Sequence, residues 1–123
     1  MCYHATKPLP PEPHSAPAAR EFLRRCYSDW GLTAMVEDSE LALSELVTNA
    51  VLHASSDPTL EVRISPTTVR VEVHDDDPTV PELRAPSLDA AGGRGLHLVA
   101  EIAARWGTEP TPRGKVVWFE LAR

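Results

Sequence analysis

The sequence contains few cysteines, no excess of basic residues and no long apolar run, and each of these absences excludes a class of protein. The two cysteines, Cys2 and Cys26, are too few and too irregularly placed for a disulfide framework or a zinc site. The 18 acidic residues outnumber the 12 lysines and arginines, and the net charge of −6 argues against a dedicated nucleic-acid-binding protein. No apolar stretch approaches the roughly 20 residues that a membrane span requires, so we expect no membrane contact.

What remains is the composition of one folded domain. At 123 residues a single domain is the default, and 42% hydrophobic residues are sufficient for a packed core. The N-terminal residues lack the apolar stretch of a secretory signal, which favours a cytoplasmic location. We therefore expect a small acidic domain of the cytoplasm.

The prolines set the first structural boundary, because five of the 12 lie before residue 18. Proline is excluded from helix interiors, so residues 1–14 are predicted to form an extended N-terminal arm. An edge strand is expected within this arm, near Tyr3 to Pro8. Residues 15–123 are then predicted to form the domain itself.

Helical periodicity occurs in three segments. The first runs from Ala18 to about Trp30, where Ser15 is placed to cap the helix and Gly31 to end it. The second runs from about Thr33 to His53, and its apolar residues repeat at the three- and four-residue spacing of a buried helix face. The third runs from Leu96 to about Arg105.

Strand-like alternation occurs in four segments. Two strands are predicted around Leu60 to Ile64 and Val69 to Val73, joined by a turn over residues 65–68. A final pair is predicted over Trp106 to Glu109 and Lys115 to Leu121. This order of elements predicts an α/β fold of the α+β kind, a two-layer sandwich whose mostly antiparallel mixed sheet is covered by three helices.

Three polar residues form a stripe along the second predicted helix. Glu45, Asn49 and His53 are spaced four residues apart, so they lie nearly one above another beside the apolar face. A charged stripe is most often a solvated helix face. Asparagine, however, is a poor helix former and a good oxygen ligand for Mg²⁺, and a carboxylate one turn away is placed to act as a general base. Both interpretations stay open on the pattern alone.

Two further motifs lie next to predicted elements. Asp75, Asp76 and Asp77 end an alternating strand, where acids either solvate a turn or accept a hydrogen bond from a ligand such as adenine. The glycine-rich residues 92–95 precede the third helix, either as a hinge and cap or as an anion site of free N–H groups and an arginine. The residues between these motifs show little periodicity and are predicted to form a long functional or mobile loop.

In order and spacing, these motifs resemble the successive boxes of the GHKL (Bergerat-fold, histidine-kinase-like) ATPases. The matching residues are Glu45-x-x-x-Asn49-x-x-x-His53, Asp75 after its strand, Gly93-Arg94-Gly95-Leu96 at a helix start, and Gly114-Lys115-Val116 on the last hairpin. The segments SELVTNAVLHA and GRGLHLV are most similar to the anti-sigma-factor serine kinase branch. The resemblance covers roughly residues 15–122 and implies the Bergerat ATP-binding fold.

The resemblance also implies roles for single residues. In that family the helix asparagine holds Mg²⁺ against the phosphates of ATP and the preceding glutamate is the general base, which implies these roles for Asn49 and Glu45. The strand-end aspartate, here Asp75, accepts a hydrogen bond from the amino group of adenine. The other residues implied at the nucleotide site are His53, Asp77, Gly93, Arg94, Gly95 and Leu96, with an ATP lid at about residues 76–92.

Activity and partners are implied in the same way. Members of the branch phosphorylate a serine on a STAS-type anti-anti-sigma protein, sequester a sigma factor and commonly form homodimers. The chain departs from the family pattern at Asp77, Thr79 and Val116, which stand where Gly, Gly and Thr are usual. An acid repels a polyanionic ligand and a missing hydroxyl weakens its binding, so the alternative is a non-enzymatic partner-binding regulator with a degenerate nucleotide site.

Overall fold

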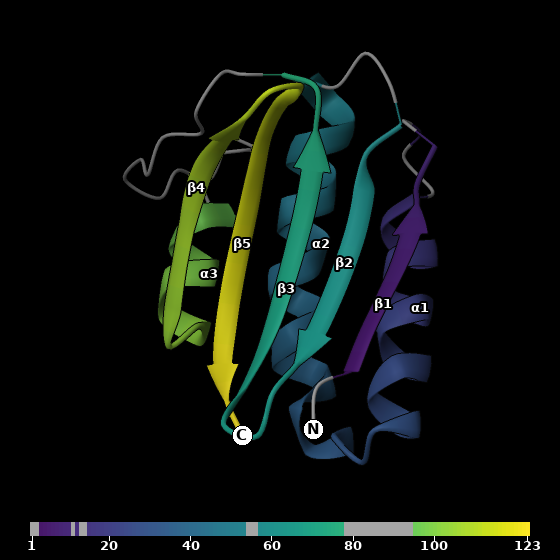
Figure 1. Ribbon diagram of the computed structural model, residues 1–123, viewed down its shortest axis with the longest axis vertical. Coiled ribbons are helices and arrows are strands. Elements are labelled where there is room, and N and C mark those ends of the chain that lie inside the picture. Colours follow the sequence, from purple (N-terminus) through teal and green to yellow (C-terminus); the bar gives the residue numbers. More distant parts are fainter. Residues whose placement is uncertain (1–2, 11, 13–14, 54–56, 78–94) are drawn as a thin grey trace.

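The alternating segments of the sequence form the strands of one sheet, and the helical segments cover one face of it (Figure 1). The computed structural model describes residues 3–10, 12, 15–53, 57–77 and 95–123. In chain order the elements are β1 (Tyr3–Pro8), α1 (Ser15–Asp29), the short 3-10 helix η1 (Thr33–Met35), α2 (Val36–His53), β2 (Thr59–Ile64), β3 (Thr68–Asp75), α3 (Gly95–Ile102), β4 (Arg105–Thr111) and β5 (Gly114–Ala122).

The five strands follow the order β1-β2-β3-β5-β4, and every neighbouring pair is antiparallel. The prediction of an α+β two-layer sandwich with three covering helices is confirmed. The expectation of a mixed sheet is wrong for the strands described. The crossover through α3 makes β4 parallel to β3, but β5 lies between them, so no parallel pair forms.

The hydrophobic core lies between the sheet and the helices. Side chains alternate across a strand, so every second residue of β2, β3 and β5 points to the helix layer. The largest fully buried side chains are Leu9, Leu23, Tyr27, Leu43, Val47, Leu60, Val62, Ile64, Val69, Val71, Val73 and Phe119. Among the described residues no helix is both long and apolar enough to cross a membrane.

The helix boundaries differ from the predicted ones at several points. Helix α1 begins at Ser15, whose hydroxyl donates to the carbonyl of Pro10 and ties the helix start to the preceding segment. Gly31 ends α1 as predicted: it adopts φ 74°, and the N–H of Leu32 bonds back to the carbonyl of Tyr27. Helix α3 ends at Ile102, because the chain has already entered β4 at Arg105.

The proline-rich N-terminal segment contributes an edge strand to the sheet. Strand β1 pairs with β2 along its whole length, from Tyr3 opposite Ile64 to Pro8 opposite Thr59. The next residue, Leu9, is fully buried, and its N–H donates to the carbonyl of Pro58. This part of the predicted arm is therefore integrated into the sheet and the core.

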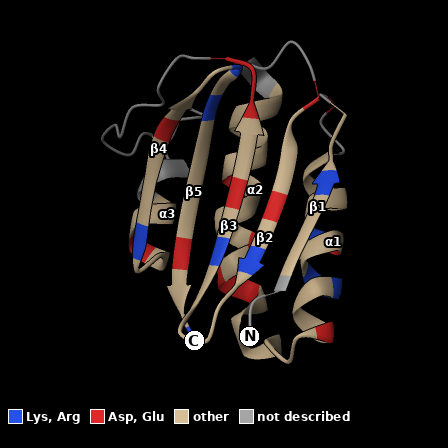
Figure 2. Cartoon of the chain, viewed as in Figure 1, with Lys and Arg blue, Asp and Glu red and all other residues tan. Residues whose placement is uncertain are grey.

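The face of the sheet opposite the helices is polar, with ion pairs such as Arg70–Glu72 and Arg70–Glu120. Figure 2 marks where the acidic and basic residues lie along the strands. Its one large aromatic residue among those described is Trp118 of β5, which lies beneath the guanidinium of Arg70 at 3.9 Å from the ring centroid. The Trp118 ring also lies against Gly107 of β4, where an added Cβ would come within 3.0 Å of it. The glycine thus makes room for the aromatic ring.

Candidate functional site

The described residues of the predicted site lie on elements that meet at one end of the molecule. The C-terminal ends of α2 and β3, the start of α3 and the hairpin between β4 and β5 all lie at this end (Figure 1). Helix α2 packs against α3, β3 and β5, so its C-terminal half lies beside the end of β3. The fold thus brings to one end motifs that are separated by up to about 70 residues in the sequence, from Glu45 to Gly114.

Glu45 and Asn49 lie one turn apart on α2, and both side chains are half-buried. Their neighbours Leu46 and Ala50 are each 2% exposed, so the stripe runs along the edge of the apolar face. A half-buried carboxylate and amide are partly desolvated but still open to a ligand. His53 is the last residue of α2, and its side chain lies outside the described residues.

Asp75 is the last residue of β3, and its side chain is only 1% exposed. One carboxylate oxygen, Oδ1, accepts two hydrogen bonds of 2.9 Å, from the Nζ of Lys115 and from the backbone N–H of Asp77. A carboxylate offers about four acceptor positions, so these two bonds orient the group without exhausting it. This is the geometry expected of an acceptor fixed in place before a ligand arrives.

Lys115 contacts Asp75, a pairing that the sequence analysis did not predict. Its side chain is 7% exposed, and its Nζ also donates to the carbonyl of Asp77 at 2.9 Å. The ammonium group therefore clamps the turn that follows β3. This contact could have been predicted only from the register of β3 and β5, in which Asp75 lies opposite Lys115.

Gly114 allows the β4–β5 hairpin to approach the end of β3. A Cβ built on Gly114 would lie 2.3 Å from the carbonyl oxygen of Asp75 and 2.6 Å from the backbone of Asp76. Real Cβ atoms do not make such contacts, so only glycine fits here without displacing the backbone. The close approach is what places Lys115 against Asp75.

The residues that depart from the family pattern occupy different positions. Asp77 is half-buried, and the structure uses its backbone N–H and carbonyl in the turn held by Asp75 and Lys115. Val116 lies opposite His74, on the face of the sheet away from Asp75. A threonine hydroxyl at position 116 would therefore not face Asp75, which corrects the expectation that its loss weakens contacts near adenine. Thr79 lies outside the described residues.

The glycine box is described only in part. Gly95 and Leu96 are the first two residues of α3, as predicted for a box that opens a helix. Gly93, Arg94 and residues 78–92 of the predicted lid lie outside the described residues. The N-terminus of α3 points toward the end of the molecule at which β3 ends (Figure 1), and a helix N-terminus favours an anion.

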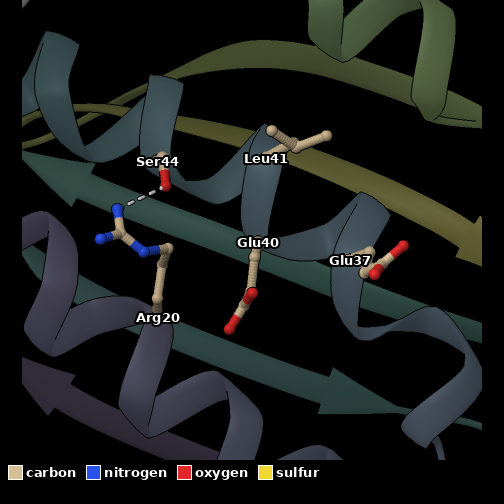
Figure 3. Close-up of a pocket in the computed structure, with 5 residues that line it drawn as sticks. All are labelled: Arg20, Glu37, Glu40, Leu41 and Ser44. Carbon is tan, nitrogen blue, oxygen red and sulfur yellow. Dashed lines mark hydrogen bonds between the residues drawn. The ribbon is translucent and has the colours of Figure 1, made fainter.

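A separate hollow lies between α1 and the first half of α2 (Figure 3). It has a volume of about 420 Å³ and is lined by Arg20, Glu37, Glu40, Leu41 and Ser44. Arg20 donates to the hydroxyl of Ser44 at 3.0 Å, and Arg24 pairs with Glu40 at 2.6 Å. Two of the three arginines of α1 thus join the two helices together.

The donor set at the Asp75 end fits a magnesium–nucleotide complex. An amide oxygen of the kind Asn49 offers is a suitable ligand for Mg²⁺, which is bound by few protein oxygens together with phosphate oxygens. Asp75 supplies a buried, oriented acceptor of the kind that an exocyclic amino group requires. The described part of the site therefore offers a hydrogen-bond acceptor for the adenine base and a polar helix stripe for the magnesium and phosphates of a nucleotide.

Comparison with known proteins is consistent with this geometry. Residues 9–121 match the family model described as the histidine kinase-like ATPase domain. The match spans every element of the structure except β1 and the last residue of β5. No curated protein matches the chain in sequence.

Proposed function

Because the chain belongs to the histidine kinase-like ATPase domain family, whose members bind ATP, we propose that it is an ATP-binding regulator of the anti-sigma-factor type. In this proposal it transfers phosphate from ATP to a serine of a STAS-type anti-anti-sigma protein and sequesters a sigma factor in the cytoplasm. The observation that carries the proposal is the oriented, buried carboxylate of Asp75 at the same end of the fold as Glu45 and Asn49.

Each residue of the site has one task in this mechanism. Asp75 accepts a hydrogen bond from the amino group of adenine and thereby fixes the base, while Lys115 and the turn at Asp77 hold its carboxylate in place. The amide oxygen of Asn49 holds Mg²⁺, which neutralises phosphate charge when bound. The carboxylate of Glu45, one turn earlier, accepts the proton of the attacking serine hydroxyl.

The reaction itself is an in-line phosphoryl transfer with ATP as the substrate. The serine oxygen forms a bond to the γ-phosphorus, the bond from that phosphorus to the bridging oxygen breaks, and ADP leaves. The serine proton moves to the Glu45 carboxylate. Positioning and exclusion of water account for most of such catalysis, and the half-buried helix stripe supports both.

The partners in this proposal come from the resemblance of SELVTNAVLHA and GRGLHLV to the anti-sigma kinase branch. They are a sigma factor, a STAS-domain protein as phosphate acceptor and a second copy of the chain in a homodimer. The net charge of −6 agrees with the expectation that the chain contacts regulatory proteins rather than nucleic acid directly.

A phosphotransfer assay tests the catalytic part of the proposal. The full chain is incubated with labelled ATP, Mg²⁺ and a STAS-domain protein, and label on the acceptor serine is followed over time. Glu45→Gln is expected to lower the rate by roughly 10²-fold or more, since it removes the base and keeps the shape. Glu37→Gln, an exposed acid two turns earlier on α2, is the matched control and is expected to retain full activity. Undiminished transfer by Glu45→Gln would refute the assignment.

The second candidate is a partner-binding regulator without enzymatic activity. It is favoured by Lys115, which already occupies Oδ1 of Asp75, and by an aspartate at position 77, where the family usually has glycine. This candidate predicts that the chain binds its protein partners equally well with and without ATP. The kinase proposal predicts that ATP and Mg²⁺ change partner affinity, so one binding measurement in both conditions separates the two.

A further inference from the structure

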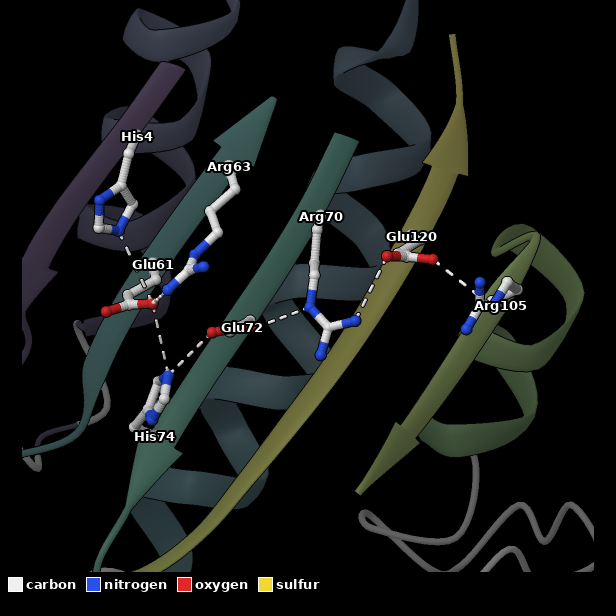
Figure 4. A network of polar contacts seen from close by, with 8 residues as sticks. All are labelled: His4, Glu61, Arg63, Arg70, Glu72, His74, Arg105 and Glu120. Carbon is white, nitrogen blue, oxygen red and sulfur yellow. Dashed lines mark hydrogen bonds and ion pairs between the residues drawn. The ribbon is translucent and has the colours of Figure 1, made fainter. Parts of the chain in front are cut away.

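A cluster of histidine and glutamate side chains lies on the polar face of the sheet (Figure 4). Glu61 of β2 lies directly opposite Glu72 of β3, and His74 follows two residues later on the same face. Each of these three residues offers one ligand atom, and the three atoms lie within 4.8 Å of one another. Like charges directly opposite on neighbouring strands repel; Arg63 and Arg70 each pair with one of these carboxylates, and a cation held between the two would relieve the repulsion further.

The donor atoms are spaced as a metal ion would require. The Nε2 of His74 is 3.0 Å from Oε1 of Glu72 and 3.7 Å from Oε2 of Glu61. The Nε2 of His4, from β1, is also 3.7 Å from Oε2 of Glu61. Ligand atoms at about 2.0–2.2 Å from a tetrahedral ion are about 3.4 Å from one another, and the Nε2 of His74 already lies near this distance from both carboxylates.

The two glutamates are held as metal ligands usually are. Oε2 of Glu72 accepts a 2.6 Å hydrogen bond from the Nε of Arg70, which leaves Oε1 directed at His74. A hydrogen-bonded partner of this kind orients a metal ligand.

We propose that Glu61, Glu72 and His74 form a binding site for a divalent transition-metal ion, with Zn²⁺ as its best fit. One imidazole with two carboxylates, and a fourth position left to water, suits Zn²⁺, whereas Mg²⁺ and Ca²⁺ prefer a shell of oxygen atoms alone. The ion replaces the proton that His74 otherwise places between the two carboxylates. The side chains of His4 and His74 are 49% and 36% exposed, which leaves an open path from solvent.

An acidic cleft beside the cluster also favours the binding of a cation. A cleft of about 410 Å³ is lined by Glu61 and His74 together with Asp57, Asp75, Asp76 and Arg113. Acidic residues outnumber basic ones along it, which raises the local concentration of cations. Against this, Arg63 lies 3.2 Å from Oε2 of Glu61 and competes for the same oxygen, although its half-exposed side chain is free to turn toward solvent.

The test is a calorimetric titration of the full chain with Zn²⁺ alone, near neutral pH and in the absence of nucleotide. The wild type is expected to bind a single ion. His74→Gln is expected to weaken binding by at least about tenfold, whereas His4→Gln leaves the three ligands in place and is expected to change the affinity much less. Arg105→Gln changes the same polar network at Glu120 without touching the cluster, and is expected to leave the affinity unchanged. Arg63→Gln removes the competing cation and is expected to tighten binding.

Two controls make the result decisive. Cys2→Ser must bind as tightly as the wild type, because a loss would place the ion on a thiolate and overturn the proposal. Asn49→Ala is also expected to bind Zn²⁺ as the wild type does. The metal site and the proposed nucleotide site are therefore tested independently. No binding below about 1 mM, or equal binding by His74→Gln in a protein of native circular dichroism, would refute the site.

Discussion

At the scale of single residues, the site depends on one buried ion pair. Asp75 and Lys115 are 7% and 5% exposed as whole residues, and their charged atoms lie 2.9 Å apart. Removing both charges from such a pair costs little, whereas removing one leaves an uncompensated buried charge. This asymmetry makes the pair open to a direct test.

Lys115→Met is expected to lower the free energy of unfolding by about 3 kcal/mol, because the Asp75 carboxylate loses its cation. Asp75→Asn in addition to Lys115→Met is expected to recover most of this loss. Chemical denaturation of the two single variants and the double variant measures the coupling. Strictly additive losses would mean that the two side chains do not interact in solution.

A second residue-scale prediction concerns Tyr27, which is fully buried and donates to the hydroxyl of Ser39 at 2.9 Å. Burial raises its pKa to about 12, with the Ser39 hydrogen bond acting in the opposite direction. The unfolded chain releases this proton near pH 10. The contribution of Tyr27 to the free energy of unfolding is therefore fully present below about pH 10 and is lost as the pH rises toward 12. The full effect of this one group amounts to about 3 kcal/mol.

Tyr27→Phe is expected to cost about 1 kcal/mol at neutral pH, through the lost hydrogen bond to Ser39. Its stability is then expected to fall less steeply than that of the wild type above about pH 10. Urea denaturation at a series of alkaline pH values measures both effects. Parallel curves for the two proteins over this range would show that Tyr27 does not titrate abnormally.

At the scale of elements, the hairpin between β4 and β5 is the part that completes the site. Gly114→Ala is expected to destabilise the fold by about 3 kcal/mol or to force the hairpin away from Asp75, since its Cβ would overlap backbone atoms. Gly31→Ala is the matched control: its φ of 74° is strained for alanine, but nothing lies within 4 Å, so about 1 kcal/mol is expected. Equal losses in the two variants would contradict the close approach at Gly114.

The elements also show which features a sequence reveals. The spacing of apolar residues was sufficient to predict the three helices, the β2–β3 hairpin and the final pair of strands. A repeat of about 3.6 residues marks the buried face of a helix, and a repeat of 2 marks that of a strand. The end of α3 was predicted too late, since Ala103 and Ala104 continue a helical pattern that the turn into β4 interrupts. Such a turn is determined by where the sheet lies, which no local pattern contains.

The candidate site, like the fold, could be predicted only in part from the sequence. Asp75 was identified from its place after an alternating strand, and Glu45 and Asn49 from their helical spacing. Lys115 and the cluster of Glu61, Glu72 and His74 were not singled out, because each depends on the register between strands that are distant in sequence. Register follows from the assembled sheet, and a shift of one residue would reverse the face of every side chain.

At the scale of the whole molecule, the two faces of the sheet carry different sets of side chains. The helix-covered face contains the core and, at one end, the Asp75 site, while the opposite face carries the polar network and the proposed metal cluster. The chain belongs to the histidine kinase-like ATPase domain family over nearly its full length, so the site at the end of the helix layer is the expected place for ATP.

The most direct test of this account is a calorimetric titration of ATP and Mg²⁺ into the full chain, beside Asn49→Ala and Thr48→Ala. Thr48 is the exposed neighbour of Asn49 on α2, so its variant controls for effects on the helix alone. The account predicts binding in the micromolar range for the wild type and Thr48→Ala, and a loss of at least about tenfold for Asn49→Ala. No binding by the wild type, or equal binding by all three proteins, would contradict it.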